Sequence, residues 1–208
     1  IQEKGIDNLT IRSIAGEVGC SHAVLYKHFE SLDYLIMLAS MRFLDEYYQE
    51  MVVIEKEEQD YVLRDLKLWS VFNRCAFKNP PVFLHLFWEH HDAIFEDAMD
   101  EYHQLFPFER GGNDETHYGY IFAVVFKGNI EDRDFVLLRH AVSQGHLSNE
   151  DAIYLSKVNP AIVQSLLRKH RYDYKEPGIS ESAASECDRL LVETFNLFYR
   201  GAPLSLAE

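Results

Sequence analysis

Apolar residues recur along nearly the whole chain at the three- and four-residue spacing of an α-helix. No stretch shows the sustained alternation of apolar and polar residues that a β-strand needs between two turns. Ile11, Ile14, Ala15 and Val18 illustrate the spacing, because these four side chains share one face of a helix. The pattern therefore predicts an all-α fold.

Two short helices near the start are bounded by residues with clear structural preferences. Thr10 is suited to cap a helix that ends at Val18, and Gly19 then stands where a left-handed backbone is favoured. Ser21 is suited to cap a second helix that ends at His28. Two short helices joined by a tight turn and followed by a longer helix are typical of a helix-turn-helix, although an ordinary helical hairpin shows the same pattern.

Longer helices are predicted beyond this point, and the first of them begins near Ser31 and continues well past residue 48. The Asn-Pro pairs at 79–80 and 159–160 each resemble a helix cap followed by a first-turn proline, so we expect a new helix to open at both places. Two glycines mark residues 107–115 as the clearest loop. The remaining predicted helices cover residues 60–77, 80–106, 116–127, 131–144, 149–157, 160–170 and 182–199.

The segment from Gly5 to Ala39 carries a dense sequence signature. It consists of LTIRSIA at 9–15, GCS at 19–21 and LYKHF at 25–29, followed by Leu35. In these residues and their spacing, the segment closely resembles the TetR family of transcriptional regulators. The resemblance implies a DNA-binding helix-turn-helix domain at 1–45 and a helical domain for effector binding and dimerisation at 46–208. It also implies that most of the family's first helix and its basic arm precede Ile1.

The same resemblance implies which side chains meet DNA. The supporting helix begins near the phosphates, and the second short helix offers its N-terminal residues to base edges. A phenol, an ammonium and an imidazole one turn later are good partners for phosphates. The predicted DNA-binding residues are Thr10, Arg12, Ser21, His22, Ala23, Val24, Tyr26, Lys27 and His28.

Two of these residues have an alternative role, and one contact expected from the family is lacking. Val24 can instead pack into the core, and His28 can simply cap the end of its helix.

The family commonly has a lysine near the start of the fourth helix where this chain has Leu32, so a phosphate contact is lost there. The backbone N–H groups of Leu32 and Asp33 can still bind a phosphate through the helix N-terminus, although the charge of Asp33 opposes this.

The formal net charge of −14 excludes a protein whose whole surface binds nucleic acid, because phosphate binding requires clustered lysine and arginine. Residues 1–42 hold four basic and five acidic side chains, a balance of −1, which leaves −13 for the remainder. Any contact with DNA is therefore local to the N-terminal segment, and the acidic remainder is kept away from DNA.

Several classes of protein are disfavoured by what the chain lacks. Cys20, Cys75 and Cys187 are far apart and form no CxxC pair, so zinc and redox chemistry are not predicted and a reducing cytoplasm is expected. No apolar run is long enough to span a membrane, and no signal peptide stands at the start. No GxSxG, phosphate-binding loop or dinucleotide motif is present, so we expect neither an enzyme nor a cofactor.

The middle helices carry the remaining candidate chemistry. Aromatic residues recur there, and the family resemblance implies that this region encloses an effector pocket, although core packing stays the alternative for any single residue. The predicted pocket residues are Trp69, Phe72, Phe87, Trp88, His91, Tyr102, Tyr118 and Phe122.

A metal site is the competing interpretation of the same region, because His85 and Glu89 share a helix face at i, i+4. It would make the chain a helical metal- or cofactor-binding protein with a degenerate helix-turn-helix. The candidate ligands are His85, Glu89, His90, His91, Asp92 and His103.

Apolar stripes on the last two predicted helices exceed what one protomer needs to bury, and they predict a two-fold dimer. The stripe residues are Ile162, Leu166, Leu190, Leu191, Phe195 and Phe198. We therefore expect a homodimer that binds a palindromic operator in double-stranded DNA and responds to a small-molecule effector. We expect repression rather than activation only because repression is the usual role in this family. The long helix from Ser31 is expected to connect effector and DNA as a lever.

Overall fold

The computed structural model of the chain describes residues 1, 3–89, 92–106 and 129–206. Within these ranges every element is an α-helix or a short 3-10 helix, which confirms the all-α fold. The predicted loop at 107–115 and the predicted helix at 116–127 lie outside the described residues. The elements are η1 (Ile6–Asn8), α1 (Ile11–Val18), α2 (His22–His28), α3 (Leu32–Ser40), η2 (Met41–Leu44), α4 (Asp45–Glu57), α5 (Tyr61–Lys78), α6 (Pro80–Phe87), α7 (Asp92–Leu105), α9 (Ile130–Ser143), α10 (Asn149–Lys169) and α11 (Ile179–Asn196).

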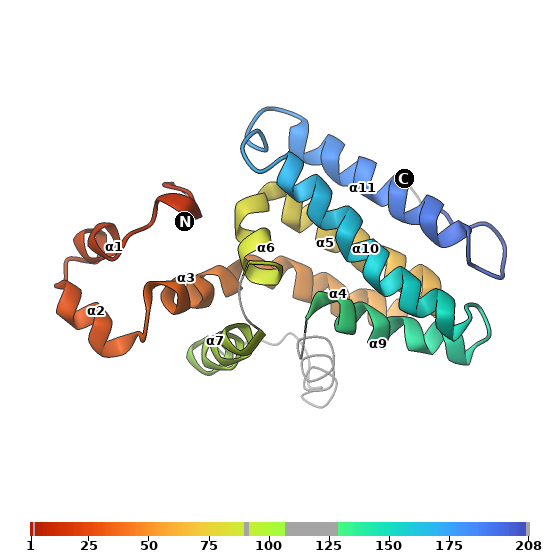
Figure 1. The fold of residues 1–208 in the computed structure, drawn as a ribbon, viewed down its shortest axis with the longest axis horizontal. Helices are drawn as coiled ribbons and strands as arrows, with labels where there is room; N and C mark the ends of the chain where they lie inside the picture. The colour runs from red at the N-terminus through yellow and green to blue at the C-terminus, as the bar shows by residue number, and fades with distance from the viewer. Residues whose placement is uncertain (2, 90–91, 107–128, 207–208) are drawn as a thin grey trace.

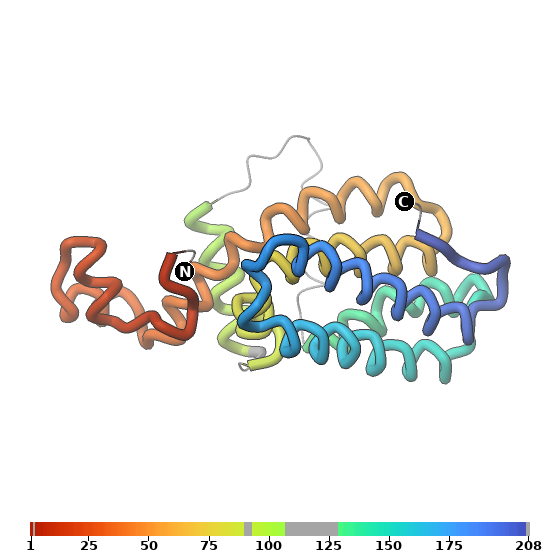
Figure 2. The backbone as a smooth tube through the Cα atoms, turned by 90° about the horizontal axis from the view of Figure 1, so that it is seen from above, coloured from red at the N-terminus to blue at the C-terminus, as the bar shows by residue number. Residues whose placement is uncertain are grey.

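The helices form a small N-terminal end and a larger bundle (Figure 1). α1 and α2 lie apart from the bundle, α3 connects them to it, and η1 contacts α6. We call residues 1–40 the head and the described residues of 45–206 the body. α7 lies beside α3, whereas α4, α5, α9, α10 and α11 make up the length of the body. The view from above shows the same projection of the head from one end (Figure 2).

Local capping fixes the two short helices of the head where the sequence predicts them. Thr10 and Ser13 form a capping box, in which the Ser13 N–H donates to Thr10 Oγ1 over 3.1 Å and the Thr10 N–H donates to Ser13 Oγ over 3.0 Å. Gly19 ends α1 with a φ of 73°, a left-handed conformation that glycine adopts without strain. Ser21 Oγ then accepts the N–H of Val24 at the start of α2.

The predicted long helix from Ser31 is interrupted by the 3-10 segment η2. Ser31 caps α3 as predicted, by accepting the N–H of Tyr34 over 3.0 Å. In a 3-10 helix, side chains three residues apart lie above one another. This winding directs both Met41 and Leu44 inward, and both are 0% exposed. The helical path therefore continues from head to body, but it is wound more tightly at the junction.

The predicted helix over 80–106 is wrong as a single element, because α6 ends at Phe87 and α7 begins at Asp92. α6 is buried from Pro80 to Leu86 without a break, so it packs on all sides inside the body. α7 instead lies against α3 and buries only one face. A straight continuation of α6 cannot reach that position, and the chain turns after Phe87.

The predicted break at Pro160 is also wrong, because α10 runs through it. Proline removes one hydrogen bond inside the helix and strains the preceding turn. Packing on both sides holds the helix together here, since Leu155, Val163 and Leu167 are all 0% exposed. The Asn159 side chain is occupied in the core, where it donates to Asp134 Oδ2 over 3.1 Å instead of capping a new helix.

α5 occupies the centre of the body, in contact with α4, α6, α9, α10 and α11. It lies in one continuous hydrophobic core to which the surrounding helices contribute large side chains, including Tyr48, Phe83 and Phe195. α10 and α11 pack against each other along one side of this core (Figure 2). None of the described helices combines the length and the apolar character needed to cross a membrane.

Candidate nucleic-acid interface and effector cavity

α2 turns almost all of its side chains to solvent. Leu25 is its buried residue, at 7% exposed, and anchors the helix to the head. Val24 is 44% exposed and Tyr26 is 59% exposed, so the alternative in which Val24 packs into the core is excluded. The exposed residues of α2 are His22, Ala23, Val24, Tyr26, Lys27 and His28. These are the side chains that the sequence assigns to bases and phosphates.

Two basic side chains of the head are available to phosphates. Arg12 and Lys27 are exposed, and neither forms an ion pair with any residue that the structure describes. Lys4 differs, because its Nζ lies 2.5 Å from Glu17 Oε1. Thr10 is exposed as well, but its hydroxyl already serves the capping box.

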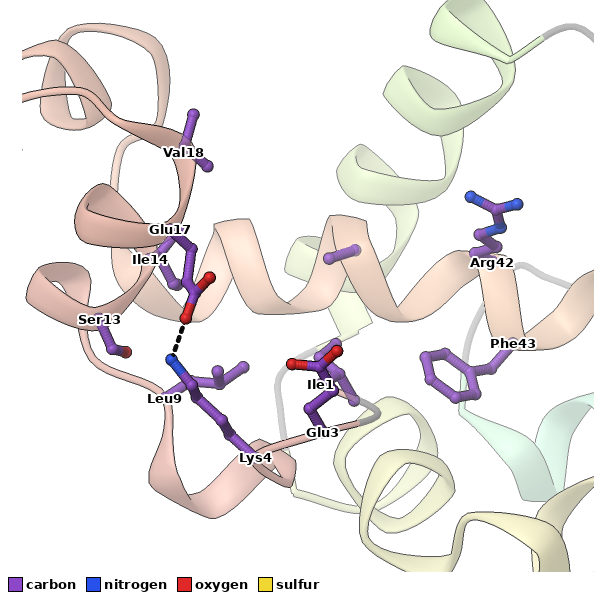
Figure 3. Close-up of a pocket in the computed structure, with 11 residues that line it drawn as sticks. Ile1, Glu3, Lys4, Leu9, Ser13, Ile14, Glu17, Val18, Arg42 and Phe43 are labelled. Carbon is purple, nitrogen blue, oxygen red and sulfur yellow. Dashed lines mark hydrogen bonds and ion pairs between the residues drawn. The ribbon is translucent and has the colours of Figure 1, made fainter.

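A groove of about 670 Å³ separates α1 from α3 and η2 on the inner side of the head (Figure 3). Its apolar lining includes Leu9, Ile14 and Phe43, and the Lys4–Glu17 ion pair crosses one edge. None of the predicted DNA-binding side chains lines it. The groove and the exposed face of α2 are therefore separate surfaces of the head.

Residues 1–36 match a family model, described as bacterial regulatory proteins of the tetR family. The head is therefore similar to the matching N-terminal segment of TetR family regulators. The match spans η1, α1, α2 and the start of α3, so it includes the exposed helix α2 and the helix α1 before it. The protein is accordingly a DNA-binding transcriptional regulator, and TetR family members are regulators rather than enzymes. No curated protein and no solved structure matches the chain.

Polar contacts at two places tie the head to the body. Arg171, which follows α10, donates to Asp7 of η1 over 2.8 Å and to Glu89 after α6 over 2.5 Å. The two carboxylates raise the pKa of Arg171 further above its ordinary value. Tyr34 of α3 donates to Glu101 of α7, which with burial raises the pKa of the phenol. The orientation of the head is therefore held by contacts at both η1 and α3.

Four of the predicted pocket residues come together in the body around Phe72. Its ring centroid lies 5.4 Å from Trp69, 5.1 Å from Phe87 and 6.4 Å from Trp88. Beside them is a cavity of about 40 Å³, bounded by α4, α5, the end of α6 and α9. The cavity is lined by Tyr47, Asp65, Leu68, Trp69, Phe72, Phe87, Ile130, Arg133, Asp134 and Leu137.

The prediction that Tyr102 belongs to the same pocket is wrong. Its hydroxyl donates to Asp45 Oδ2 over 3.1 Å, and its ring lines a separate groove with Leu38 and Arg42. The cause is the turn after α6, which places α7 beside the head and not along the cavity. The other predicted pocket residues, His91, Tyr118 and Phe122, lie outside the described residues.

Two buried carboxyl groups in the cavity wall are absent from the sequence prediction. Asp134 is 2% exposed and accepts from Trp69 Nε1 over 2.7 Å and from Asn159 Nδ2 over 3.1 Å. Asp65 is 1% exposed, and among the described residues neither of its oxygens has a hydrogen-bond partner. Burial raises the pKa of both groups, and the negative charges of Asp134 and Glu55 raise that of Asp65 further.

The sequence contained a signal for Asp65 that composition alone does not reveal. Asp65 stands three residues after Val62 and four before Trp69, so it shares the apolar face of α5. A charged residue at a core position costs free energy unless a partner compensates it. The position of Asp65 on that face therefore indicates a buried carboxyl group with a specific role.

The metal-site interpretation receives no support from the part of the chain that the structure describes. No three histidine, cysteine, aspartate or glutamate side chains gather there into a possible metal site. Glu89 is engaged by Arg171 over 2.5 Å, and His85 is buried in α6. His90 and His91 lie outside the described residues.

Half of the predicted dimer stripe lies inside the protomer. Leu166, Leu191 and Phe195 are at most 8% exposed, because α10 and α11 turn these side chains toward the core around α5. The premise that one protomer does not need to bury them is therefore wrong for these three residues. The other predicted stripe residues, Ile162, Leu190 and Phe198, are half-buried at the edge of the core.

Replacing Arg171 with alanine is expected to loosen the head without unfolding the body. The lost pair with Asp7 is partly exposed, and such pairs contribute about 0.2–1 kcal/mol. Backbone amides of α1 and α2 should then exchange hydrogen up to about fivefold faster, while those of α5 are unchanged. The matched control is Arg189→Ala, which removes an ion pair within α11. Unchanged exchange in the head would show that the Arg171 pairs do not restrain it.

Replacing Asp65 with asparagine is expected to stabilise the protein, and increasingly so at higher pH. The pKa of Asp65 is higher in the folded chain than its ordinary value of 3.8 in the unfolded chain. Between these two pKa values the folded chain keeps the proton of Asp65 while the unfolded chain has released it. The free energy of unfolding therefore falls as pH rises from the lower pKa to the higher one. Each unit of raised pKa corresponds to about 1.4 kcal/mol. Thermal unfolding from about pH 5 to about pH 8 should show a variant whose Tm exceeds that of the wild type by a widening margin. A constant or negative margin would contradict the assignment.

Proposed function

We propose that this TetR family protein is a homodimeric repressor that binds a palindromic operator and releases it when an effector occupies the body. The observation that supports this proposal most strongly is the exposed face of α2, which lies within the segment that matches the family model. Six of the seven side chains of α2 are free of the core, as a recognition helix in the major groove requires. The acidic body supports contact through the head alone.

Within the recognition helix, position decides the role that we propose for each side chain. His22, Ala23 and Val24 form the first turn of α2 and are assigned to base edges, which carry sequence information. Tyr26 and Lys27 follow and are assigned to phosphates, together with Arg12 of α1. Phosphate contacts fix the position of the helix on the duplex but do not distinguish sequences.

A palindromic operator requires two heads about 34–36 Å apart or a small multiple of this distance. We propose that the outer faces of α10 and α11 pair with those of a second copy in a four-helix arrangement. Exposed large apolar side chains support this choice, since Tyr154 of α10 is 52% exposed and Leu197, directly after α11, is 79% exposed. Half-buried Ile162 and Leu190 lie on the same two helices.

The proposed release of DNA follows the helical path from the cavity to the head. Tyr47 of α4 lines the cavity, and α4 continues through η2 into α3. A 3-10 segment inside a longer helical path is a common position for a hinge. An effector that contacts one tilt of α4 better than another shifts the spacing of the two heads, and a coupling of about 1–3 kcal/mol changes DNA affinity by about 5- to 150-fold.

Lys27→Ala is expected to weaken binding to every duplex alike, because a phosphate contact is sequence-independent. The slope of log affinity against log salt concentration should fall by about one unit. His22→Ala should instead change which operator sequence is preferred in a binding-site selection. Lys56→Ala is the control, because it removes an exposed lysine of α4 in the body. If Lys27→Ala left affinity and salt dependence as in Lys56→Ala, the recognition-helix assignment would be wrong.

The double variant Ile162→Glu and Leu190→Glu is expected to sediment as a monomer and to lose operator affinity. Both side chains are half-buried, so charges are tolerated in the folded protomer but are costly in a packed interface. Circular dichroism should report unchanged helix content. Val53→Glu on α4, at a position that is 50% exposed, provides the control and should remain dimeric. A folded double variant that still dimerises would place the interface elsewhere.

A further inference from the structure

Asp65 is the most unusual polar group in the described part of the body. Both of its carboxyl oxygens are buried without a hydrogen-bond partner, while the neighbouring Asp134 has two donors. Buried polar groups in folded proteins are nearly always satisfied, so an exception calls for a specific explanation. Asp65 lines the cavity, which gives its oxygens a place to receive a donor from outside the chain.

The walls around Asp65 are suited to a positive charge. The rings of Tyr47, Trp69, Phe72 and Phe87 line the same cavity, and aromatic faces attract cations. The charged groups that act on Asp65 from its neighbours are the acidic Asp134 and Glu55. One side chain of the cavity wall already makes such a contact, because the Arg133 guanidinium lies 5.3 Å from the ring centroid of Phe87.

The size of the cavity limits which part of a ligand it receives. A volume of about 40 Å³ has room for a group about the size of one or two water molecules. An ammonium or amidinium head group is of this order, and it brings at least three N–H donors. A complete drug-sized ligand does not fit this space, so the cavity is suited to hold only the charged end of one.

We propose that the cavity binds the protonated amine or amidine head group of the effector, with its N–H groups donating to Asp65 and its charge surrounded by Tyr47, Trp69, Phe72 and Phe87. This inference rests on the proposed function, because it names the chemical class of the effector in that function. A cationic donor compensates both the empty acceptors of Asp65 and the negative charge that Asp65 acquires when it loses its proton, whereas a neutral donor compensates only the acceptors. The wall holds the two carboxyl groups of Asp65 and Asp134 against the single guanidinium of Arg133, so its acidic groups outnumber its basic one and favour a cationic over an anionic head group.

Binding of three amines tests the proposal directly: benzylammonium, 2-phenylethylammonium and 3-phenylpropylammonium. Each is compared with the alcohol of the same length and with 3-phenylpropionate, using calorimetry and the fluorescence of Trp69 and Trp88. We expect at least one ammonium ion to bind the full chain at least tenfold more tightly than its alcohol, and the carboxylate not to bind.

Asp65→Asn is expected to lower the affinity for the bound ammonium ion at least tenfold while the variant stays folded, as shown by its thermal unfolding. Asp188→Asn is the matched control, because Asp188 is a half-buried carboxyl group that accepts from Ser70 and Asn73 of α5 outside the cavity. Its affinity for the ammonium ion should equal that of the wild type. Glu at position 65 keeps the charge, so Asp65→Glu should retain more affinity than Asp65→Asn.

The possible outcomes separate this inference from the function on which it rests. Equal affinity for an ammonium ion and its alcohol, no binding of any of the three amines, or an undiminished affinity in Asp65→Asn would each overturn the head-group site. Operator binding by the same samples is measured in parallel. Intact operator binding with any of these results rejects the head-group site alone, whereas loss of operator binding by the wild-type chain rejects the proposed function.

Discussion

The enclosure of α5 by five other helices is the constraint on which the body depends, because every buried polar side chain on this helix must find a partner inside the protein. Trp69 meets the requirement by donating to Asp134 of α9. Ser70 and Asn73 meet it by donating to Asp188 of α11. These polar pairs fix the register of α9 and α11 against α5, which apolar packing alone specifies less strictly. Asp65 is the exception.

An unsatisfied buried carboxyl group destabilises the protein in which it stands. Such groups persist where they serve binding, since selection maintains stability above a threshold and not at its maximum. The surroundings of Asp65 agree with this view, because the same cavity wall contains Asp134, whose oxygens are both occupied. The core thus supplies hydrogen-bond donors to the carboxyl group of Asp134 but none to that of Asp65.

Local features of the sequence predicted the head well, whereas the body required information that is not local. The caps at Thr10 and Ser21 act within three residues, so their geometry is encoded where it occurs. Pro160 carries a local signal to end a helix, but contacts with α9 and α11 on both sides of it are stronger. Likewise, the winding of η2 and the separation of Tyr102 from the cavity follow from which helices pack together. Periodicity does not contain that information.

The cavity also has two physical connections to the head, and this makes it a better origin for a switch than any other described part of the body. One runs from Tyr47 through α4 and η2 into α3. The other runs from Phe87, the last residue of α6, to nearby Glu89 and its ion pair with Arg171, which also holds η1. A ligand can shift an equilibrium only through contacts that differ between its states. A head group bound at Asp65 contacts both Tyr47 and Phe87. A movement of either residue therefore changes the binding free energy of the head group.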